Sequence, residues 1–250
     1  MLDTAIKEKW LTANGGVIGF FPANAVGDDI EVYTDETRTE VLTTLHNLRQ
    51  QGEHRDGIPN RSLGDFVAPK DTGLADYVGA FAVTSGLGGG EKIAEFKAAL
   101  DDYSAILLES IADRLAEAFA ERMHQRSARS SGGYQPDEQL DNDALIGEKY
   151  VGIRPAPGYP ACPEHTEKMT LWELMDVKER TGIELTESMA MWPGAAVSGW
   201  YFSHPQSQYF VVGRLAQDQV ADYARRKAGP WPRPSAGWRR ISATTRRTRS

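Results

Sequence analysis

The sequence predicts a mixed α+β fold, in which helices flank a twisted and mainly antiparallel sheet. Short apolar runs of strand type follow one another in hairpin-like pairs, separated by turn segments. Longer segments with apolar residues at three- and four-residue steps interrupt these pairs, as amphipathic helices do. Because strands and helices do not alternate regularly, and no internal repeat is visible, a doubly wound parallel sheet is disfavoured.

Strands are expected where short runs of apolar residues occur. Residues 17–21 form a continuous apolar run, whereas residues 29–33 alternate polar and apolar side chains, as a half-buried strand does. Residues 22–27, beginning with Pro22, are expected to form the turn between them. Further strands are expected at 75–83, 184–191, 201–205 and 208–213, and one more is expected to begin at Phe66.

The longest helix is expected from about Glu91 to His124. Its apolar residues recur at helical spacing, and they are Ile93, Phe96, Leu100, Tyr103, Leu107, Ile111, Leu115 and Phe119. The small and polar segment 127–133 is expected to break that pattern. Shorter helices are expected at 5–14, 39–51, 136–149, 171–181 and 217–227, with Gly182 as the C-cap of the fourth.

Composition and charge restrict the class of protein. The 250 residues suffice for one large domain or two small ones, and 40% of them are hydrophobic and 25% charged. No apolar stretch is long enough for a transmembrane helix, and the N-terminus lacks the apolar core of a signal peptide. The single cysteine, Cys162, excludes an internal disulfide framework, so a cytoplasmic location is expected.

The charge is distributed unevenly along the chain. Residues 225–250 hold nine bases and no acid, so the remaining 224 residues hold 19 bases against 35 acids. Because of this excess of acids, residues 1–224 are a poor partner for nucleic acid or an anionic membrane. We expect residues 1–227 to form the folded domain, and the Arg-rich tail at 228–250 to be disordered. A nucleic-acid-binding role for that tail is the less favoured alternative to an uninformative extension.

The segment from Arg154 to His165 is the most informative motif, because it holds four prolines and one glycine. Each proline fixes its own backbone and pushes the preceding residue toward an extended conformation. We therefore expect a stiff, irregular loop, which loses little entropy when a small ligand binds. Arg154 is suited to grip a carboxylate with two parallel hydrogen bonds, and Tyr159 is suited to cover a planar or apolar group.

Other local patterns carry weaker signals. Cys162 and His165 are too few to hold zinc, so we expect no metal site, and their spacing does not indicate a catalytic nucleophile and base. The glycines at 86–90 lack the residues of a phosphate-binding loop and are expected to form a turn. The small and aromatic residues at 194–202 favour core packing over base stacking.

Asp113 and Glu117 lie four residues apart on the expected long helix, so they share one face of it. That face is roughly opposite the expected apolar stripe. A solvated pair is the default interpretation, and a paired carboxylate site requires another layer to cover that face.

The proline-rich run at 154–168 resembles the S-adenosylmethionine-binding loop of cobalamin-dependent methionine synthase. That family carries an Arg-x-x-x-Gly-Tyr signature, which Arg154, Gly158 and Tyr159 match. The resemblance covers about residues 15–227. It is supported by further long matches at 26–33, 35–38, 65–70, 112–121, 191–194 and 198–205.

The resemblance implies a C-terminal activation domain. In this family the domain presents S-adenosylmethionine to cobalamin that has been oxidised to inactive cob(II)alamin, and an electron from flavodoxin or an equivalent reductase permits remethylation to methylcobalamin. The full enzyme is a cytoplasmic methyltransferase of methionine biosynthesis, which moves a methyl group from methyltetrahydrofolate to homocysteine. The implied partners are a neighbouring cobalamin-binding module and that reductase.

The resemblance also implies roles for individual residues. Arg154 would bind the ligand carboxylate, and the carbonyl of Ala156 would receive the adenine amino group. Gly158 belongs to the signature, and Tyr159 would lie near the sulfonium, where an aromatic face favours a cation. Tyr209 and Phe210 occupy ligand-contacting positions of the family. Asp113 and Glu117 match carboxylates that face the cobalamin side and hold the cobalt-ligand histidine of the neighbouring module, which changes the interpretation of that helix face from solvated to functional.

Two departures from the family pattern matter. The family's domain begins some tens of residues before Met1, with an aspartate that contacts the ligand, and the match stops near Lys227, where the tail resembles a shifted reading frame. The folate, homocysteine and cobalamin modules are also missing, so we expect no catalytic residue and no turnover in this chain alone. The alternative is a non-catalytic S-adenosylmethionine-binding or docking fragment that presents its acidic face to a partner.

Overall fold

A computed structural model describes residues 1–12, 15–53, 57–131 and 133–227, so the expectation of a disordered tail at 228–250 falls outside the described residues. The fold is α+β, as expected, and its main sheet is antiparallel with strand order β3-β2-β1-β4-β7. Its strands are β1 (Val17–Val26), β2 (Asp29–Tyr33), β3 (Val41–Leu45), β4 (Asp76–Thr84) and β7 (Ala196–Tyr201), and a separate hairpin pairs β5 (Glu184–Leu185) with β6 (Met191–Trp192).

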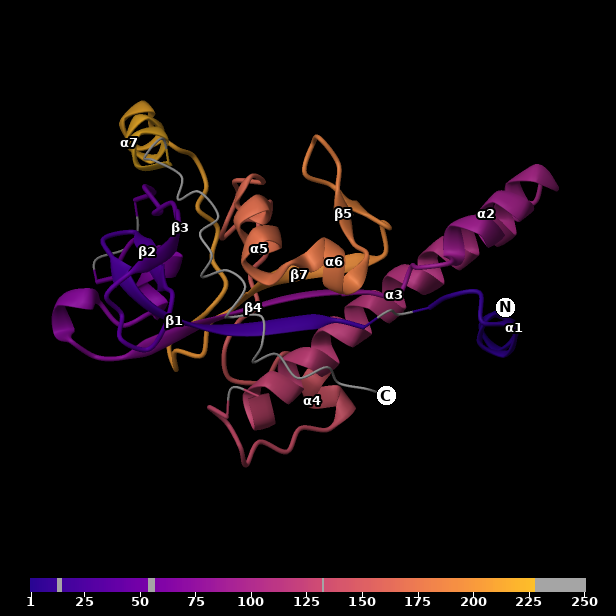
Figure 1. The fold of residues 1–250 in the computed structure, drawn as a ribbon, viewed down its shortest axis with the longest axis horizontal. Helices are drawn as coiled ribbons and strands as arrows, with labels where there is room; N and C mark the ends of the chain where they lie inside the picture. Colours follow the sequence, from indigo (N-terminus) through magenta and orange to yellow (C-terminus); the bar gives the residue numbers. More distant parts are fainter. Residues whose placement is uncertain (13–14, 54–56, 132, 228–250) are drawn as a thin grey trace.

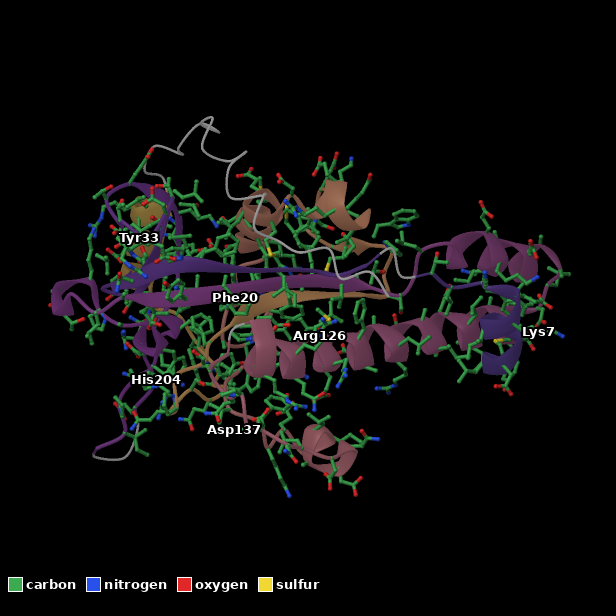
Figure 2. The ribbon with its side chains drawn as sticks, turned by 60° about the horizontal axis from the view of Figure 1, so that its bottom comes forward. Lys7, Phe20, Tyr33, Arg126, Asp137 and His204 are labelled. Atoms are coloured by element: carbon green, nitrogen blue, oxygen red, sulfur yellow. The ribbon has the colours of Figure 1, made fainter. Side chains whose placement is uncertain are left out.

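Helices cover both faces of this sheet. They are α1 (Leu2–Glu8), α2 (Gly89–Ala98), α3 (Asp102–Arg126), α4 (Asn142–Ile146), α5 (Glu167–Met175), α6 (Val177–Thr181) and α7 (Gln217–Lys227). Helix α3 crosses one face of the sheet, whereas α5 and α6 lie on the other (Figures 1 and 2). Helix α7 lies beyond β2 and β3, at the opposite end of the molecule from α1 and α2 (Figure 1). None of the helices in the described ranges is long and apolar enough to cross a membrane.

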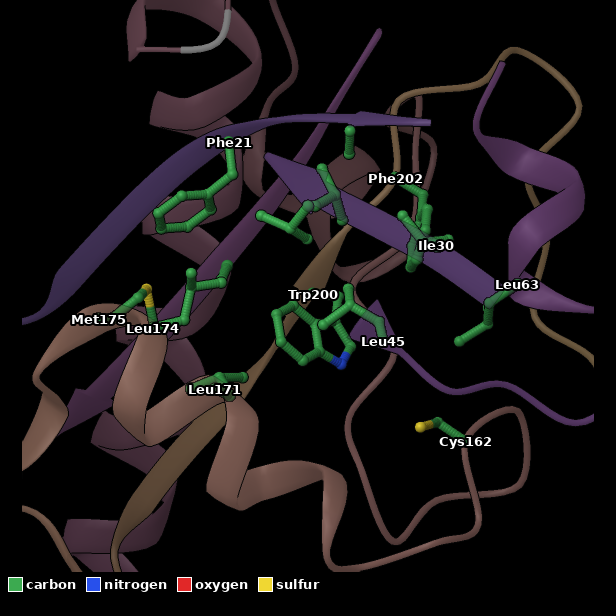
Figure 3. Packing of buried hydrophobic residues seen from close by; sticks show 14 of the residues in the cluster. Phe21, Ile30, Leu45, Leu63, Cys162, Leu171, Leu174, Met175, Trp200 and Phe202 are labelled. Atoms are coloured by element: carbon green, nitrogen blue, oxygen red, sulfur yellow. The ribbon is translucent and has the colours of Figure 1, made fainter. Parts of the chain in front are cut away.

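The two faces of the sheet separate the hydrophobic core into two layers. Successive side chains of a strand point to opposite faces. In β7, Trp200 packs with Leu171 and Leu174 of α5 in the larger cluster (Figure 3), whereas Tyr201 packs with Phe81 and with Met123 of α3 in the smaller one. The aromatic residues expected to be core are therefore buried in the core.

The expected turn at 22–27 is wrong, because β1 runs through it to Val26. Pro22 lies opposite Tyr77 of β4, but β2 pairs with β1 only from Ala23 onward. On that side β1 is an edge strand at Pro22, and an edge position tolerates a residue without a backbone N–H. The turn to β2 is confined to Gly27 and Asp28.

The expected helix at 39–51 is also wrong, because residues 41–45 form strand β3. Val41, Thr43 and Thr44 are β-branched, which favours strand over helix. Leu42 and Leu45 are buried, and Leu45 pairs with Ile30 of β2. The apolar spacing of this segment fits both structures, and pairing with β2 determines which of them forms.

The expected long helix is divided, and its buried face differs from the predicted one. Leu100 adopts a left-handed backbone (φ +58°) between α2 and α3. Leu100 and Tyr103 of the predicted stripe are 90% and 77% exposed. The buried face instead consists mostly of small residues, which allow the helix to approach the sheet closely, and it comprises Ala105, Leu108, Ala112, Ala116, Ala120, Met123 and His124.

Several smaller expectations need correction. Segment 127–133 does not simply break the helix, because residues Ser127–Ser131 continue it as a π-helical turn. Phe66 ends a 3₁₀ helix (Leu63–Phe66) rather than beginning a strand. The strand expected at 184–191 is the β5–β6 hairpin, and the strand expected at 201–205 instead ends at Tyr201. Residues 208–213 form no strand.

Other expectations are confirmed. Strands β2 and β4 lie within one residue of the expected 29–33 and 75–83, whereas β1 begins at Val17 as expected and continues to Val26. Helix α7 matches 217–227, and α4 lies within 136–149. Helices α5 and α6 fill the expected 171–181 but begin earlier, at Glu167, and α1 overlaps the expected 5–14 only at residues 5–8. Gly182 ends α6 with φ +76°, and its N–H donates to the carbonyl of Lys178 at 2.8 Å. Of the glycines at 86–90, Gly86 and Gly88 lie in a turn that leads into α2, as expected, whereas Gly89 and Gly90 are the first residues of that helix.

Candidate functional site

The proline-rich loop lies along the outer edge of β7, as an irregular extension of the sheet. Ile153 and Phe202 exchange two backbone hydrogen bonds of 3.0 Å, and the Trp200 N–H donates to the carbonyl of Pro155 at 2.9 Å. A Cβ atom on Gly199 would lie 2.7 Å from that carbonyl oxygen, so glycine permits this approach. The loop is irregular, as expected, and it is fixed to the core at its beginning.

The centre of the loop is a tight turn that directs one aromatic ring outward. The Gly158 N–H donates to the carbonyl of Cys162 at 2.7 Å, and the Cys162 N–H donates to the carbonyl of Tyr159 at 2.9 Å. Gly158 has φ +94°, a conformation that glycine adopts without strain. The Tyr159 N–H donates to the carbonyl of Ala156 at 3.1 Å, and the Tyr159 side chain is 65% exposed.

Arg154, at the start of the loop, is held by groups from three parts of the chain. Its Nη1 lies 3.2 Å from Nδ1 of His124 and donates to the hydroxyl of Tyr150. Its Nη2 lies 3.7 Å from Oε2 of Glu121, and its Cζ lies 5.3 Å from the centre of the Tyr150 ring. The backbone N–H of Arg154 donates to the hydroxyl of Tyr209 at 3.0 Å.

A column of aromatic rings connects the sheet to the Arg154 guanidinium. Phe81 of β4 stacks on Tyr201 of β7, with ring centres 4.7 Å apart. The ring of His124 lies 5.2 Å from that of Tyr201 and 4.5 Å from that of Tyr150. The guanidinium packs against Tyr150, so its position depends on buried rings rather than on a flexible surface.

Burial alters the titration of the groups beneath Arg154. Burial lowers the pKa of His124 to about 3, and the positive charge of Arg154 acts in the same direction. Burial raises the pKa of Glu121 above its ordinary value, although the nearby Arg154 opposes this effect. Burial also raises the pKa of the Tyr150 hydroxyl. At neutral pH, His124 and Tyr150 are therefore uncharged beside the cation.

Residues 209–212 cross the loop like a strap. Tyr209 accepts the hydrogen bond from Arg154, and the Val212 N–H donates to the carbonyl of Pro160 at 2.9 Å. Phe210 packs against Phe66, with ring centres 6.3 Å apart, and Tyr209 remains 46% exposed. We refer to residues 209–212 as the strap. The structure thus brings Arg154, the loop and the strap together.

The carboxylates Asp113 and Glu117 lie on α3 and are exposed. Glu121, one turn further along the same face, ends this row beside Arg154. Glu117 is close enough to Glu121 to raise its pKa. The helix therefore extends a row of carboxylates away from Arg154 toward solvent.

A family model described as "Vitamin B12 dependent methionine synthase, activation domain" matches residues 1–228. The chain belongs to this activation-domain family. A solved structure, the crystal structure of the MetH reactivation domain bound to AdoHcy, is 60% identical to the chain, with a TM-score of 0.88. The match covers 91% of this chain and 69% of that one. The fold of this activation domain is therefore that of the MetH reactivation domain.

Cys162 and His165 have different surroundings, because Cys162 is buried and His165 is exposed. Cys162 is buried, and burial raises the pKa of its thiol. A Cβ atom on Gly158 would lie 2.4 Å from the His165 ring, and Nδ1 of that ring lies 3.2 Å from Nζ of Lys168. Over the described ranges, no group of three or more His, Cys, Asp or Glu side chains could hold a metal ion.

Sequence reasoning missed three residues that contact the Arg154 guanidinium: Glu121, His124 and Tyr150. Glu121 and His124 are 33 and 30 residues before Arg154 in the sequence, and no spacing connects them to the loop. Tyr150 lies four residues before Arg154, just outside the recognised motif. The one local signal is Gly152, which lies between Tyr150 and Arg154 in the sequence. Its φ of +95° lets the chain pass close to His124.

Proposed function

We propose that this activation domain binds S-adenosylmethionine between Arg154, the proline-rich loop and the strap. The observation that carries the proposal is the largely buried Arg154 guanidinium, which His124, Tyr150 and Glu121 hold in one orientation. The loop that begins at Arg154 exposes the ring of Tyr159, and the partly exposed Tyr209 accepts a hydrogen bond from the Arg154 backbone. The AdoHcy in the 60% identical MetH structure, a ligand of the same chemical class, supports it.

Each part of the ligand has a suitable neighbour in this surface. Arg154 would bind the carboxylate, since charge-assisted bonds from guanidinium to carboxylate are among the strongest in proteins. The carbonyl of Ala156 accepts one bond from Tyr159 and retains a second lone pair for the adenine amino group. Gly158 would contribute through the tight turn that it forms, which directs the ring of Tyr159 outward.

The aromatic residues would hold the reactive end of the ligand. The exposed face of Tyr159 attracts a cation through its ring quadrupole, so it would lie near the sulfonium. Tyr209 and Phe210 would contact the ligand from the strap. In this arrangement the domain holds the methyl group and does not itself react with it.

The reaction served would be the reductive remethylation of cob(II)alamin in cytoplasmic methionine biosynthesis. Cobalamin, bound by a neighbouring module, would supply the metal centre that accepts the methyl group once flavodoxin or an equivalent reductase has donated an electron. The carbon–sulfur bond of the ligand would break, and its electron pair would remain on sulfur. Asp113 and Glu117 would face that module and accept hydrogen bonds from its histidine. The chain alone would therefore show binding without turnover.

Calorimetric titration with S-adenosylmethionine tests the proposal. Arg154→Ala should weaken binding by at least about tenfold, because a hydrogen-bonded charge pair is lost. Arg114→Ala, which removes an exposed arginine of α3, is the matched control and should bind like the parent. Equal affinity of Arg154→Ala and the parent would contradict the proposal. Binding without remethylation of an added cobalamin module and reductase would instead identify a docking fragment.

A further inference from the structure

The guanidinium of Arg154 has one edge engaged by the protein and one edge available. Nη1 carries two hydrogens, and its two partners are Nδ1 of His124 and the hydroxyl of Tyr150. Because arginine is always protonated and only donates, Nδ1 of His124 is the acceptor, and the proton of this neutral ring is on Nε2. Both Nη1 hydrogens are thus directed inward.

The opposite edge consists of Nε and Nη2. Within residues 1–12, 15–53, 57–131 and 133–227, no hydrogen bond from either atom is present, and Oε2 of Glu121 lies 3.7 Å from Nη2, beyond hydrogen-bond length. The two N–H groups of this edge are parallel, which is the geometry that binds a carboxylate in a bidentate manner. The orientation of Nη1 therefore determines where a ligand carboxylate is received.

His124 is fixed firmly enough to set that orientation. It is 1% exposed, and its ring lies between those of Tyr150 and Tyr201. Gly152 covers it closely, since a Cβ atom there would lie 3.5 Å from Nε2 of His124 and 2.7 Å from the carbonyl oxygen of Phe202. Two packed rings and the nearby backbone at Gly152 therefore restrict the position of the His124 ring.

We propose that His124 is a positioning residue for the ligand. It accepts a hydrogen bond from Nη1 of Arg154 and thereby turns the Nε–Nη2 edge toward the carboxylate of S-adenosylmethionine. This inference rests on the proposed function, and it adds a residue that does not itself touch the ligand.

The test compares S-adenosylmethionine with its decarboxylated form, which differs only in the group that Arg154 binds. The affinity for S-adenosylmethionine divided by the affinity for the decarboxylated form measures carboxylate recognition alone. His124→Phe keeps a ring between the tyrosines but removes the acceptor, and this ratio should fall by about tenfold, as expected for one misdirected charge-assisted bond. His124→Asn retains an acceptor near the position of Nδ1 and should preserve the ratio. Met123→Leu, a buried change of similar volume on the same helix, should also preserve it.

The outcomes separate the two proposals. If Arg154→Ala leaves the ratio unchanged, the proposed function fails. If Arg154→Ala lowers the ratio but His124→Phe does not, or weakens both ligands equally, His124 is a structural residue only and this inference is overturned. If His124→Phe does not unfold cooperatively, His124→Gln takes its place, and the affinity ratio should fall in the same way. The amide of the introduced glutamine lies nearer the position of Nε2 than that of Nδ1, so it does not replace the acceptor for Arg154.

Discussion

At the scale of single residues, the site depends on an uncharged histidine beside an arginine. His124 is buried between the rings of Tyr150 and Tyr201, and its Nδ1 lies 3.2 Å from Nη1 of Arg154. Glu121 lies on the far side of that contact, 3.7 Å from Nη2 of Arg154. A second positive charge here would repel the guanidinium and remove the acceptor on Nδ1. The protein avoids this by burying the ring, which disfavours the protonated form.

The depressed pKa of His124 predicts a pH dependence of stability. The pKa is about 3 in the folded chain and 6.5 as the ordinary value, so the unfolded state binds a proton first as the pH falls. Stability should be full above pH 6.5 and decline below it, by about 1 kcal/mol between pH 7.5 and pH 5.5. Urea denaturation of the parent and of His124→Asn at both pH values measures this contribution. An equal decline in the two proteins would contradict it.

At the scale of elements, α7 holds the strap in place. Glu167 of α5 is 2% exposed, and its Oε1 accepts bonds from Nζ of Lys227 at 2.7 Å and from the hydroxyl of Tyr223 at 2.9 Å. Tyr223 also packs with Leu48 and with Val212 of the strap. Helix α7 therefore connects the core under α5 to the segment that carries Tyr209.

Glu167→Gln should loosen this connection. Removing the charge of Glu167 leaves the ammonium of Lys227 poorly paired. Because both side chains are largely buried, we expect the free energy of unfolding to fall by about 1–3 kcal/mol. The N–H of Val212, bonded to Pro160 in the parent, should exchange with deuterium faster. Glu187→Gln, at an exposed position, serves as the control. An unchanged exchange rate at Val212 would show that α7 does not hold the strap.

At the scale of the whole molecule, the sequence predicts the fold class and the central motif, but not how distant parts meet. The α+β class and the loop from Arg154 to His165 follow from local chemistry, because prolines and glycine restrict the backbone directly. The apolar pattern of α3 predicts the wrong buried face. The face that is buried consists largely of alanines, which are only weakly hydrophobic, and they are recognised as buried only when the helix is seen packed on the sheet. Strand β3 likewise could not be predicted from its own residues, because pairing with β2 determines that this segment forms a strand rather than a helix.

The same reasoning explains which parts of the site were found. Gly158, Tyr159 and Arg154 lie within one motif, so family resemblance located them together. The residues that orient Arg154 come from α3 and from the segment before the loop, and only tertiary packing places them there. The ligand-binding role of Arg154 is thus proposed from a motif, whereas the reason for its fixed orientation comes from the fold.

A crystal structure of the chain with S-adenosylmethionine tests the central claim most directly. We predict that the ligand carboxylate lies on the Nε–Nη2 edge of Arg154, with two bonds of about 2.7–2.9 Å, while Nη1 stays on His124 and Tyr150. The sulfonium should lie by the ring of Tyr159. A ligand bound elsewhere, or a carboxylate held by another residue and turned away from Arg154, would contradict the account.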